Sequence, residues 1–377
     1  MGKQVVIIGG GVGGTIVANL LDRRLGGQLD ITVVDRKGKH FYEPGLLFAM
    51  LGHADPAKLW RPERKLLRRN IRLKLAEAQR IDPYTRFVSL ENGEQLPYDY
   101  LVLAPGARLD PSAVPGFEGN AHHFYDGPAA MELRKAIEAF EGGQILMGPA
   151  SLPYKCPPAP LEAALLLEQY FKEHPTRKPV KIRYLSPIGR AFTLETVSPV
   201  VERLFAQRGI ELTTFFNIES IDGKRGTVTS MEGETVSYDL LILAPPHRGA
   251  KIAEVSGLAG PGGWIQTDRS TLQVKGFPNI FALGDATDLP LSKAGSTAHF
   301  EAPIVAEGIV AAIHGRAAEL EYDGHVMCFF ETGYGKGMVL DFNYNRPPHV
   351  SHPTRLAHWE KLAFNRAYWA TIPKARV

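Results

Sequence analysis

The stretch Gly9-Gly-Gly11-Val-Gly-Gly14 follows an apolar run at residues 5–8 and precedes a helical pattern at residues 14–24. Its G-x-G-x-x-G spacing is typical of a dinucleotide cradle. Gly9 permits a tight turn, Gly11 lets the backbone approach a pyrophosphate, and Gly14 lets the helix pack against the strand. Asp35 ends the next predicted strand, 21 residues after Gly14 (35 − 14), where an acid that binds ribose is expected. The sequence therefore predicts a dinucleotide bound at the N-terminal βαβ unit.

Beyond this unit, short β-branched runs alternate with helical patterns, which is typical of parallel α/β sheets. The segments Tyr98-Asp-Tyr-Leu-Val-Leu-Ala-Pro105 and Tyr238-Asp-Leu-Leu-Ile-Leu-Ala-Pro245 are similar, and we interpret them as equivalent ends of two related domains. We predict an α/β fold of two Rossmann-like domains, the second inserted in the first, followed by a short C-terminal region with an amphipathic helix. The predicted division is 1–110 with 245–320, then 111–244, then 321–377.

The composition is that of an ordinary globular protein, with 44% hydrophobic residues in 377. A net charge of +3 is too small and too dispersed to indicate a nucleic-acid partner. The sequence has no run of about 18 apolar residues, as a spanning helix needs, and it enters a strand at once without the features of a signal peptide. We therefore expect a cytoplasmic protein. Two cysteines are too few for a zinc site, and His122, His123 and His299 lack metal-ligand spacing, so no metal is expected.

The nature of the dinucleotide is indicated by residues 279–286, Asn-Ile-Phe-Ala-Leu-Gly-Asp-Ala. They resemble the second FAD fingerprint of the pyridine nucleotide–disulfide oxidoreductase superfamily. The resemblance implies that Asp285 binds the flavin ribitol and that the following helix points its N-terminus toward the ring. Ala104-Pro-Gly106 resembles the Ala-Thr-Gly turn of the same superfamily. FAD is therefore the predicted cofactor. The predicted cofactor-binding residues are Gly9, Gly11, Gly14, Asp35, Pro44, Ala78, Ala104, Gly106, Gly284, Asp285 and Lys293.

A second turn, Gly148-Pro-Ala-Ser-Leu-Pro-Tyr-Lys-Cys-Pro-Pro-Ala-Pro-Leu-Glu162, lies between a predicted strand at 144–147 and a predicted helix at 161–171. In an enzyme with two dinucleotide sites, this turn would cradle NAD. Its prolines offer no N–H to a pyrophosphate. The next strand, 181–185, ends in Ser-Pro and supplies no acid for a ribose. We expect no NAD binding in the usual manner.

The only cysteines are Cys156 in this turn and Cys328 in an apolar run at 326–330. Cys156 precedes a predicted helix and follows Lys155, which predicts a lowered thiol pKa. An inert buried cysteine is the alternative for each residue taken alone. Because one of only two thiols replaces a nucleotide cradle, we interpret them as a redox pair. They are 172 residues apart (328 − 156), so the fold must bring them together.

Four segments resemble sulfide:quinone oxidoreductases and the flavoprotein subunit of flavocytochrome c sulfide dehydrogenase. They are Tyr154-Lys-Cys-Pro-Pro-Ala-Pro-Leu-Glu162, His40-Phe-Tyr-Glu-Pro44, Pro290-Leu-Ser-Lys-Ala-Gly295 and Cys328-Phe-Phe-Glu-Thr-Gly333.

The resemblance covers nearly the whole chain and implies a Cys156–Cys328 disulfide near the flavin. It also implies that sulfide attacks this disulfide to give a persulfide. Electrons then pass through FAD to a quinone, and sulfur leaves as polysulfide or zero-valent sulfur. The chain lacks the third cysteine of many quinone-reducing relatives. It also lacks the upstream cysteine through which other relatives attach FAD, so non-covalent FAD is expected.

Two further residues complete the predicted catalytic set of Cys156, Cys328, Glu162 and Lys293. Glu162 is six residues beyond Cys156 and could relay protons, although the helix dipole alone also favours an acid there. Lys293 could stabilise reduced flavin or orient a quinone carbonyl; the alternative is a solvated loop lysine.

Residues 354–371 combine aromatic residues with cations, which favours a helix in a membrane interface. The alternatives are packing over the flavin or against a second subunit in a homo-oligomer. We predict a FAD-dependent sulfide:quinone oxidoreductase on the cytoplasmic face of a membrane. Three other functions stay open: a flavocytochrome c-type sulfide dehydrogenase, a type II NADH dehydrogenase and a non-catalytic flavin-bound sulfur sensor.

Overall fold

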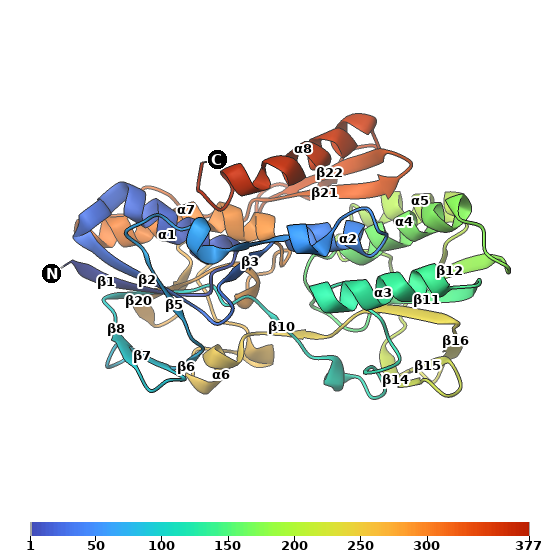
Figure 1. The fold of residues 1–377 in the computed structure, drawn as a ribbon, viewed down its shortest axis with the longest axis horizontal. Coiled ribbons are helices and arrows are strands. Elements are labelled where there is room, and N and C mark those ends of the chain that lie inside the picture. The colour runs from blue at the N-terminus through green and yellow to red at the C-terminus, as the bar shows by residue number, and fades with distance from the viewer. Residues whose placement is uncertain (1, 377) are drawn as a thin grey trace.

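The computed structural model describes residues 2–376 and contains two parallel sheets (Figure 1). The first sheet has β1 near its centre, paired in parallel with β2 and β9. Its strands, in spatial order, are β19 (Gln273–Val274), β20 (Phe277–Ala282), β9 (Tyr100–Leu103), β1 (Lys3–Ile8), β2 (Leu29–Asp35) and β5 (Arg72–Leu75).

The two faces of this sheet bury different residues, because side chains alternate along a strand. Val5 and Ile7 face a core that contains helices α1 (Val12–Leu25) and α7 (Gly295–Ile313). Val6 and Ile8 face a second core. That core is closed by α6 (Lys251–Val255) and by a three-stranded antiparallel sheet of β6 (Ala78–Asp82), β7 (Phe87–Leu90) and β8 (Gln95–Pro97). Burial on both faces explains the continuous apolar runs of β1 and β9.

The second parallel sheet repeats this plan. Its strands, in spatial order, are β13 (Glu211–Thr213), β12 (Val180–Leu185), β11 (Gly143–Pro149) and β17 (Leu240–Ala244). Three helices accompany it: α3 (Gly127–Ala139), α4 (Ala159–Glu173) and α5 (Ser198–Arg208). An antiparallel sheet of β14 (Ile218–Asp222), β15 (Thr227–Ser230) and β16 (Thr235–Ser237) closes its other side. The predicted α/β class with two Rossmann-like sheets is confirmed; the exact domain bounds stay a prediction.

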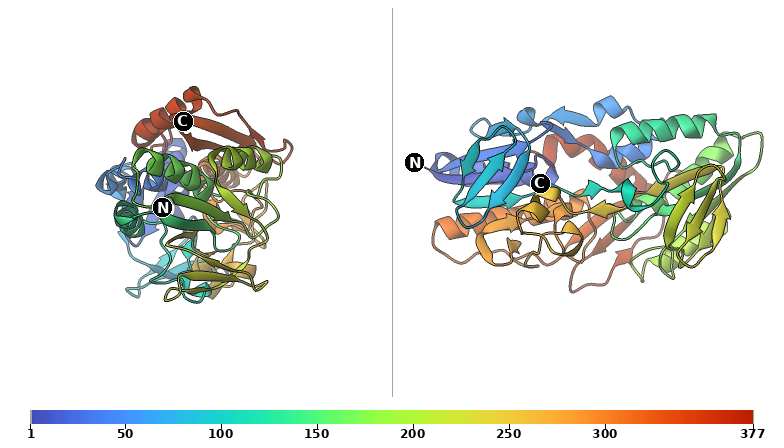
Figure 2. Two further views of the ribbon diagram at one scale, coloured as in Figure 1. Left: turned by 90° about the vertical axis from the view of Figure 1, so that its right-hand side faces the viewer. Right: turned by 90° about the horizontal axis from the view of Figure 1, so that it is seen from below.

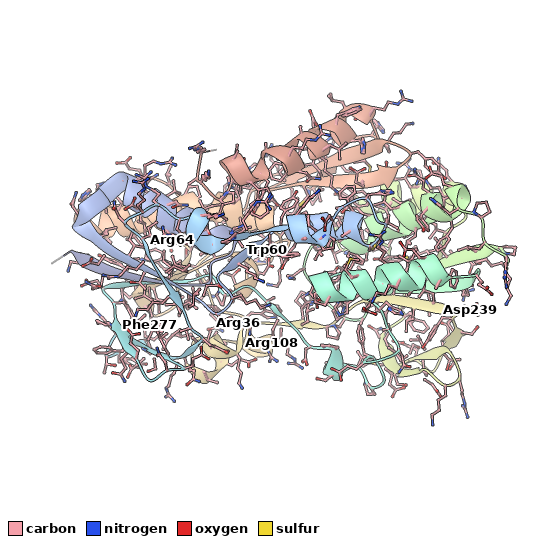
Figure 3. All side chains as sticks on the ribbon, viewed as in Figure 1. Arg36, Trp60, Arg64, Arg108, Asp239 and Phe277 are labelled. Atoms are coloured by element: carbon pink, nitrogen blue, oxygen red, sulfur yellow. The ribbon has the colours of Figure 1, made fainter. Side chains whose placement is uncertain are left out.

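The two units lie side by side, as the view from below in Figure 2 shows. The two chain segments that link them pair as short antiparallel strands, β10 (Arg108–Leu109) and β18 (His247–Arg248). Arg108, labelled in Figure 3, holds this junction by donating to the Gly249 carbonyl at 3.1 Å and pairing with Glu254 at 3.3 Å.

The C-terminal residues form a layer over both units (Figure 1). It consists of the strands β21 (Val326–Gly333), β22 (Lys336–Phe342) and β23 (His349–Val350), followed by helix α8 (Arg355–Thr371). The Thr354 hydroxyl caps α8 by accepting from the Ala357 N–H at 3.1 Å. Helix α8 packs on β22 and β21, while β21 also contacts α4 and α7. Strand β21 therefore touches both units.

Candidate active site

The glycine-rich turn after β1 is shaped for a ligand on one side only. Gly9 has a φ of +104°, and a Cβ there would come within 2.2 Å of the Ala104 carbonyl oxygen. A Cβ at Gly14 would come within 2.0 Å of the Gly9 carbonyl oxygen. A Cβ at Gly11, by contrast, would meet no described atom within 4 Å. Gly9 and Gly14 close the turn, whereas Gly11 leaves the N-terminus of α1 open to a pyrophosphate.

The predicted ribose-binding acid supports the same turn. Asp35 Oδ2 accepts from the Gly10 N–H at 3.0 Å, and Oδ1 accepts from Lys37 and Gly38 N–H at 2.8 and 2.6 Å. The other predicted ligands of this region lie around it. Ala104 and Gly106 follow β9, Ala78 begins β6 and is partly buried, and Pro44 is exposed in a short turn after β3 (Lys39–Phe41).

The second predicted FAD segment follows β20. Asp285 is shielded there beside two lysines, and burial raises its pKa to about 6 against the opposing charge of Lys155. Lys293 is buried, so the alternative of a solvated loop lysine is wrong. Its ammonium donates to the Thr287 carbonyl at 2.7 Å and lies 3.8 Å from the centre of the Trp264 ring. Burial lowers its pKa. These contacts fix the loop that follows the FAD segment.

The proline-framed turn of the second unit is attached to this loop. The Cys156 N–H donates to the Lys293 carbonyl at 2.6 Å, and the Cys156 carbonyl accepts from Ala159 at 2.8 Å, just where α4 begins. Lys155 extends its ammonium to the Glu43 carboxylate, at 2.9 Å from both oxygens. Cys156 therefore lies between the two units, and Lys155 is directed to the first of them.

Cys328 reaches the same region from the C-terminal layer. It lies on β21 opposite Leu340, and its sulfur is 3.5 Å from the hydroxyl of Ser296 in the first turn of α7. Both cysteines are free thiols in the structure.

A buried ion pair lies beside both thiols. Glu162, in the first turn of α4, accepts from the Lys361 ammonium at 2.5 Å and from the Glu331 N–H at 2.6 Å. Lys361 belongs to α8 and is 6% exposed. The charges of Glu162 and Lys361 act on both sulfurs, since Glu162 raises and Lys361 lowers the pKa of each thiol. Two residues 172 positions apart (328 − 156) thus share one electrostatic environment.

The prediction of a lowered pKa for Cys156 is wrong. Burial is the main cause that raises the pKa of its thiol well above the ordinary value, and Glu162 and Cys328 raise it further. Burial also raises the pKa of Cys328. Lys155, expected to favour the thiolate, is paired with Glu43 instead. The cation that does favour it is Lys361.

Comparison with known proteins shows which families and structures the chain resembles. Residues 3–139 match the model of the pyridine nucleotide-disulphide oxidoreductases, and residues 130–245 match the central part of the sulfide dehydrogenase (flavocytochrome c) flavoprotein chain. The mitochondrial sulfide:quinone oxidoreductase of Mus musculus is 26% identical over 93% of this chain and 80% of its own. The sulfide-quinone reductase of Aquifex aeolicus is 26% identical over 98% of this chain and 90% of its own.

The X-ray structure of the sulfide:quinone oxidoreductase from Aquifex aeolicus has the same fold, with a TM-score of 0.87 at 23% identity. It covers 98% of this chain and 91% of that one. Over nearly its whole length, the chain is similar to sulfide:quinone oxidoreductases, and the two family models together span residues 3–245. It is a flavin-dependent oxidoreductase, and the family implies FAD as its cofactor. The resemblance given by the sequence motifs is confirmed.

Several residues of this site were missed by sequence reasoning: Ser296, Glu331, His358 and Lys361. The His358 Nδ1 lies 3.0 Å from the Glu331 carboxylate, and burial raises the pKa of that carboxyl. Lys361 is one of the cations at residues 354–371 that favoured a helix in a membrane interface, whereas the structure buries its side chain. A signal was available, because Ala357, Lys361 and Tyr368 recur at spacings that place them on one buried face of α8.

Helix α8 of this sulfide:quinone oxidoreductase relative packs with its inner side against the first unit. Its Tyr368 hydroxyl is 2.7 Å from His40 Nε2, and the Tyr368 ring stacks obliquely on Tyr42 at 4.4 Å between centroids. Leu356 and Trp359 are 66% and 60% exposed on its outer side. Within residues 2–376, no helix is long and apolar enough to cross a membrane. Contact of the outer side with a membrane surface stays a prediction.

Proposed function

We propose that the chain oxidises sulfide, with Cys156 and Cys328 as a redox pair, and passes the electrons through non-covalent FAD to a quinone. One observation carries this proposal: two thiols remote in sequence face the same buried Glu162–Lys361 pair. One of them occupies the turn that would otherwise cradle a nicotinamide dinucleotide. Relatives named as sulfide:quinone oxidoreductases match nearly the full chain, which supports these substrates.

The residues present fit FAD. The open side of Gly11 and the N-terminus of α1 suit its pyrophosphate, and Asp35 lies beside them. The segment with Gly284, Asp285 and Lys293 would meet the flavin end. The cofactor held there would supply two-electron redox chemistry between the sulfur site and a quinone. Because both cysteines of the chain belong to the redox pair, none is left to attach the flavin covalently.

The protein groups at the thiols have defined tasks. In the oxidised enzyme, hydrosulfide attacks one sulfur of the Cys156–Cys328 bond. That bond breaks, a cysteine persulfide forms, and the second cysteine leaves as a thiolate. Lys361 stabilises this thiolate, since it lowers the pKa of both thiols. We assign acceptance of the persulfide proton to Glu162, because its charge acts on both sulfurs and it contacts Lys361 directly.

The test is anaerobic addition of sulfide while the flavin absorbance is recorded. Wild type is expected to lose its oxidised-flavin band. The Cys156→Ser and Cys328→Ser variants should keep it, although dithionite should still reduce both. Flavin content measured for each variant controls for loss of cofactor. Bleaching of either serine variant at the wild-type rate would contradict the redox-pair proposal.

A flavocytochrome c-type dehydrogenase is the second candidate, favoured by the family match over residues 130–245. Steady-state turnover with a short-chain quinone and with a cytochrome c as alternative acceptors separates the two. We expect the quinone to support turnover. We place the enzyme on the cytoplasmic face of a membrane, with Leu356 and Trp359 as contacts.

NADH is not expected to bleach the flavin. Prolines 157, 158 and 160 occupy the turn and the first turn of α4, where a pyrophosphate would need N–H donors.

A further inference from the structure

A line of polar groups leads from the thiols to the surface of α8. Glu162 and Lys361 are buried beside the sulfurs. Glu331, 1% exposed, follows on β21: its backbone contacts Glu162, and its carboxylate lies 3.0 and 3.1 Å from His358 Nδ1. The His358 side chain is 22% exposed. A fully buried acid thus has a partner that reaches solvent.

The charge balance of this cluster favours uptake of a proton. Two carboxylates, Glu162 and Glu331, face one ammonium, Lys361, in a region shielded from water. Burial tends to lower the pKa of Lys361, but the two carboxylates together raise it, so it stays charged. Burial raises the pKa of Glu331 above the ordinary value, and Lys361 and His358 oppose that shift. Glu331 is therefore suited to alternate between its neutral and charged forms.

We propose that Glu331 and His358 carry the proton released by sulfide from the Glu162–Lys361 pair to solvent. This inference rests on the proposed function. Hydrosulfide attack breaks the disulfide and gives Cys–S–S–H and a cysteine thiolate. After the persulfide loses its proton, its outer sulfur and the thiolate would join as Cys–S–S–S–Cys, and bound FAD would take up the two electrons released. The persulfide proton passes to Glu162 and then through Glu331 and His358 to water. Atoms and charge balance, since hydrosulfide supplies both the sulfur and the proton.

The same sheet offers a matched control. His325 Nε2 lies 2.9 Å from Asp341 Oδ2, a second histidine–carboxylate pair at the C-terminal layer. Both of its side chains are about a third exposed, and neither contributes to the pKa shift of either thiol. Loss of the His325 pair removes a comparable interaction without touching the thiol cluster.

The experiment follows flavin reduction by sulfide in a stopped-flow instrument, with Glu331→Gln, His358→Ala and His325→Ala. We expect reduction to slow about 10- to 100-fold in the first two, in the range lost with a proton-transfer group. The double variant Glu331→Gln/His358→Ala should be no slower than the slower single variant, because both residues serve one route. His325→Ala should keep the wild-type rate. Added imidazole should restore His358→Ala, since the position reaches solvent.

Imidazole rescue separates proton transfer from a structural role, which a small base would not repair. If Glu331→Gln does not fold, His358→Ala and its rescue decide the question alone. Rates of His358→Ala equal to those of His325→Ala, or no rescue by imidazole, would overturn the proton route and leave the redox pair standing. Absence of flavin reduction in wild type would overturn the proposed function and this inference with it.

Discussion

Replacement of Lys361 by methionine tests whether the buried cation holds the C-terminal layer to the thiol site. The ammonium pairs with Glu162 at 2.5 Å, also interacts with Glu331, and is 6% exposed. Removal of one partner from a buried ion pair costs about 3–5 kcal/mol of stability, because the remaining charge loses its compensation. We therefore expect Lys361→Met to lower the free energy of unfolding by about 3–5 kcal/mol at pH 8.

The loss should depend on pH. Burial raises the pKa of Glu331 and Lys361 opposes this shift, so without the ammonium the pKa of Glu331 in the folded protein rises further above the unfolded value of about 4.3. Carboxyls with raised pKa values stabilise the fold fully below the unfolded pKa, and that contribution disappears as pH rises through the folded pKa. The deficit of Lys361→Met should thus shrink at pH 5.5, by at most about 1.4 kcal/mol per pH unit for the Glu331 carboxyl.

Urea denaturation followed by circular dichroism at both pH values measures the effect. Arg366→Met is the matched control, since Arg366 is an exposed cation of the same helix. It should change stability by less than about 0.5 kcal/mol. A Lys361→Met variant as stable as Arg366→Met at pH 8 would refute the reasoning, as would a deficit independent of pH.

Three further predictions follow from other parts of the site. Iodoacetamide should label the cysteines of the reduced, folded protein at pH 7.5 at least ~10-fold more slowly than those of an unfolded sample. The reason is that burial raises the pKa of both thiols, and the thiolate is the reactive form. Equal labelling rates in the two samples would contradict this prediction. Gly11→Val should lose FAD on gel filtration, because the valine side chain would fill the open face of the glycine-rich turn. The control Gly27→Ala, whose new side chain would also lie in open space, should retain FAD. Full retention of FAD by Gly11→Val would argue against binding at this turn. The double variant Leu356→Glu/Trp359→Glu should sediment less with anionic liposomes than wild type. Its thermal stability should not change, since both side chains are exposed. Unchanged sedimentation would rule out contact between these two residues and a membrane.

Local patterns predicted the elements that position the cofactor. The apolar run at residues 5–8 lies in β1, the helical pattern at 14–24 lies in α1, and the helix predicted at 161–171 lies in α4. These elements are recognisable because their periodicity and glycine turns lie within a few neighbouring residues. Helix α3 was missed, although Asp126 caps it by accepting from the Ala129 N–H. The capping residue Asp126 directly follows residues 122–125, His-His-Phe-Tyr, which show no regular pattern.

The electrostatics of the site could not be predicted in the same way. Glu162 and Lys361 are 199 residues apart, and no short pattern links them. The pKa of Cys156 depends on how deeply the fold buries it and on which cation faces it. Because Lys155 is adjacent to Cys156 in the sequence, it was expected to lower the pKa of that thiol. In the structure, the Lys155 ammonium pairs with Glu43, and the cation that lowers the pKa of Cys156 is Lys361 of the C-terminal helix.

The C-terminal layer bears on how the enzyme can move. Strand β21 contacts α7 of one unit and α4 of the other, which adds to the links made by the β10–β18 pair and by the Cys156–Lys293 hydrogen bond. A sulfur–sulfur bond tolerates only a narrow range of separations between its two residues. A hinge rotation of one half against the other would pull Cys328 away from Cys156. We therefore expect the C-terminal layer to restrain rotation of one half against the other for as long as the two cysteines are bonded.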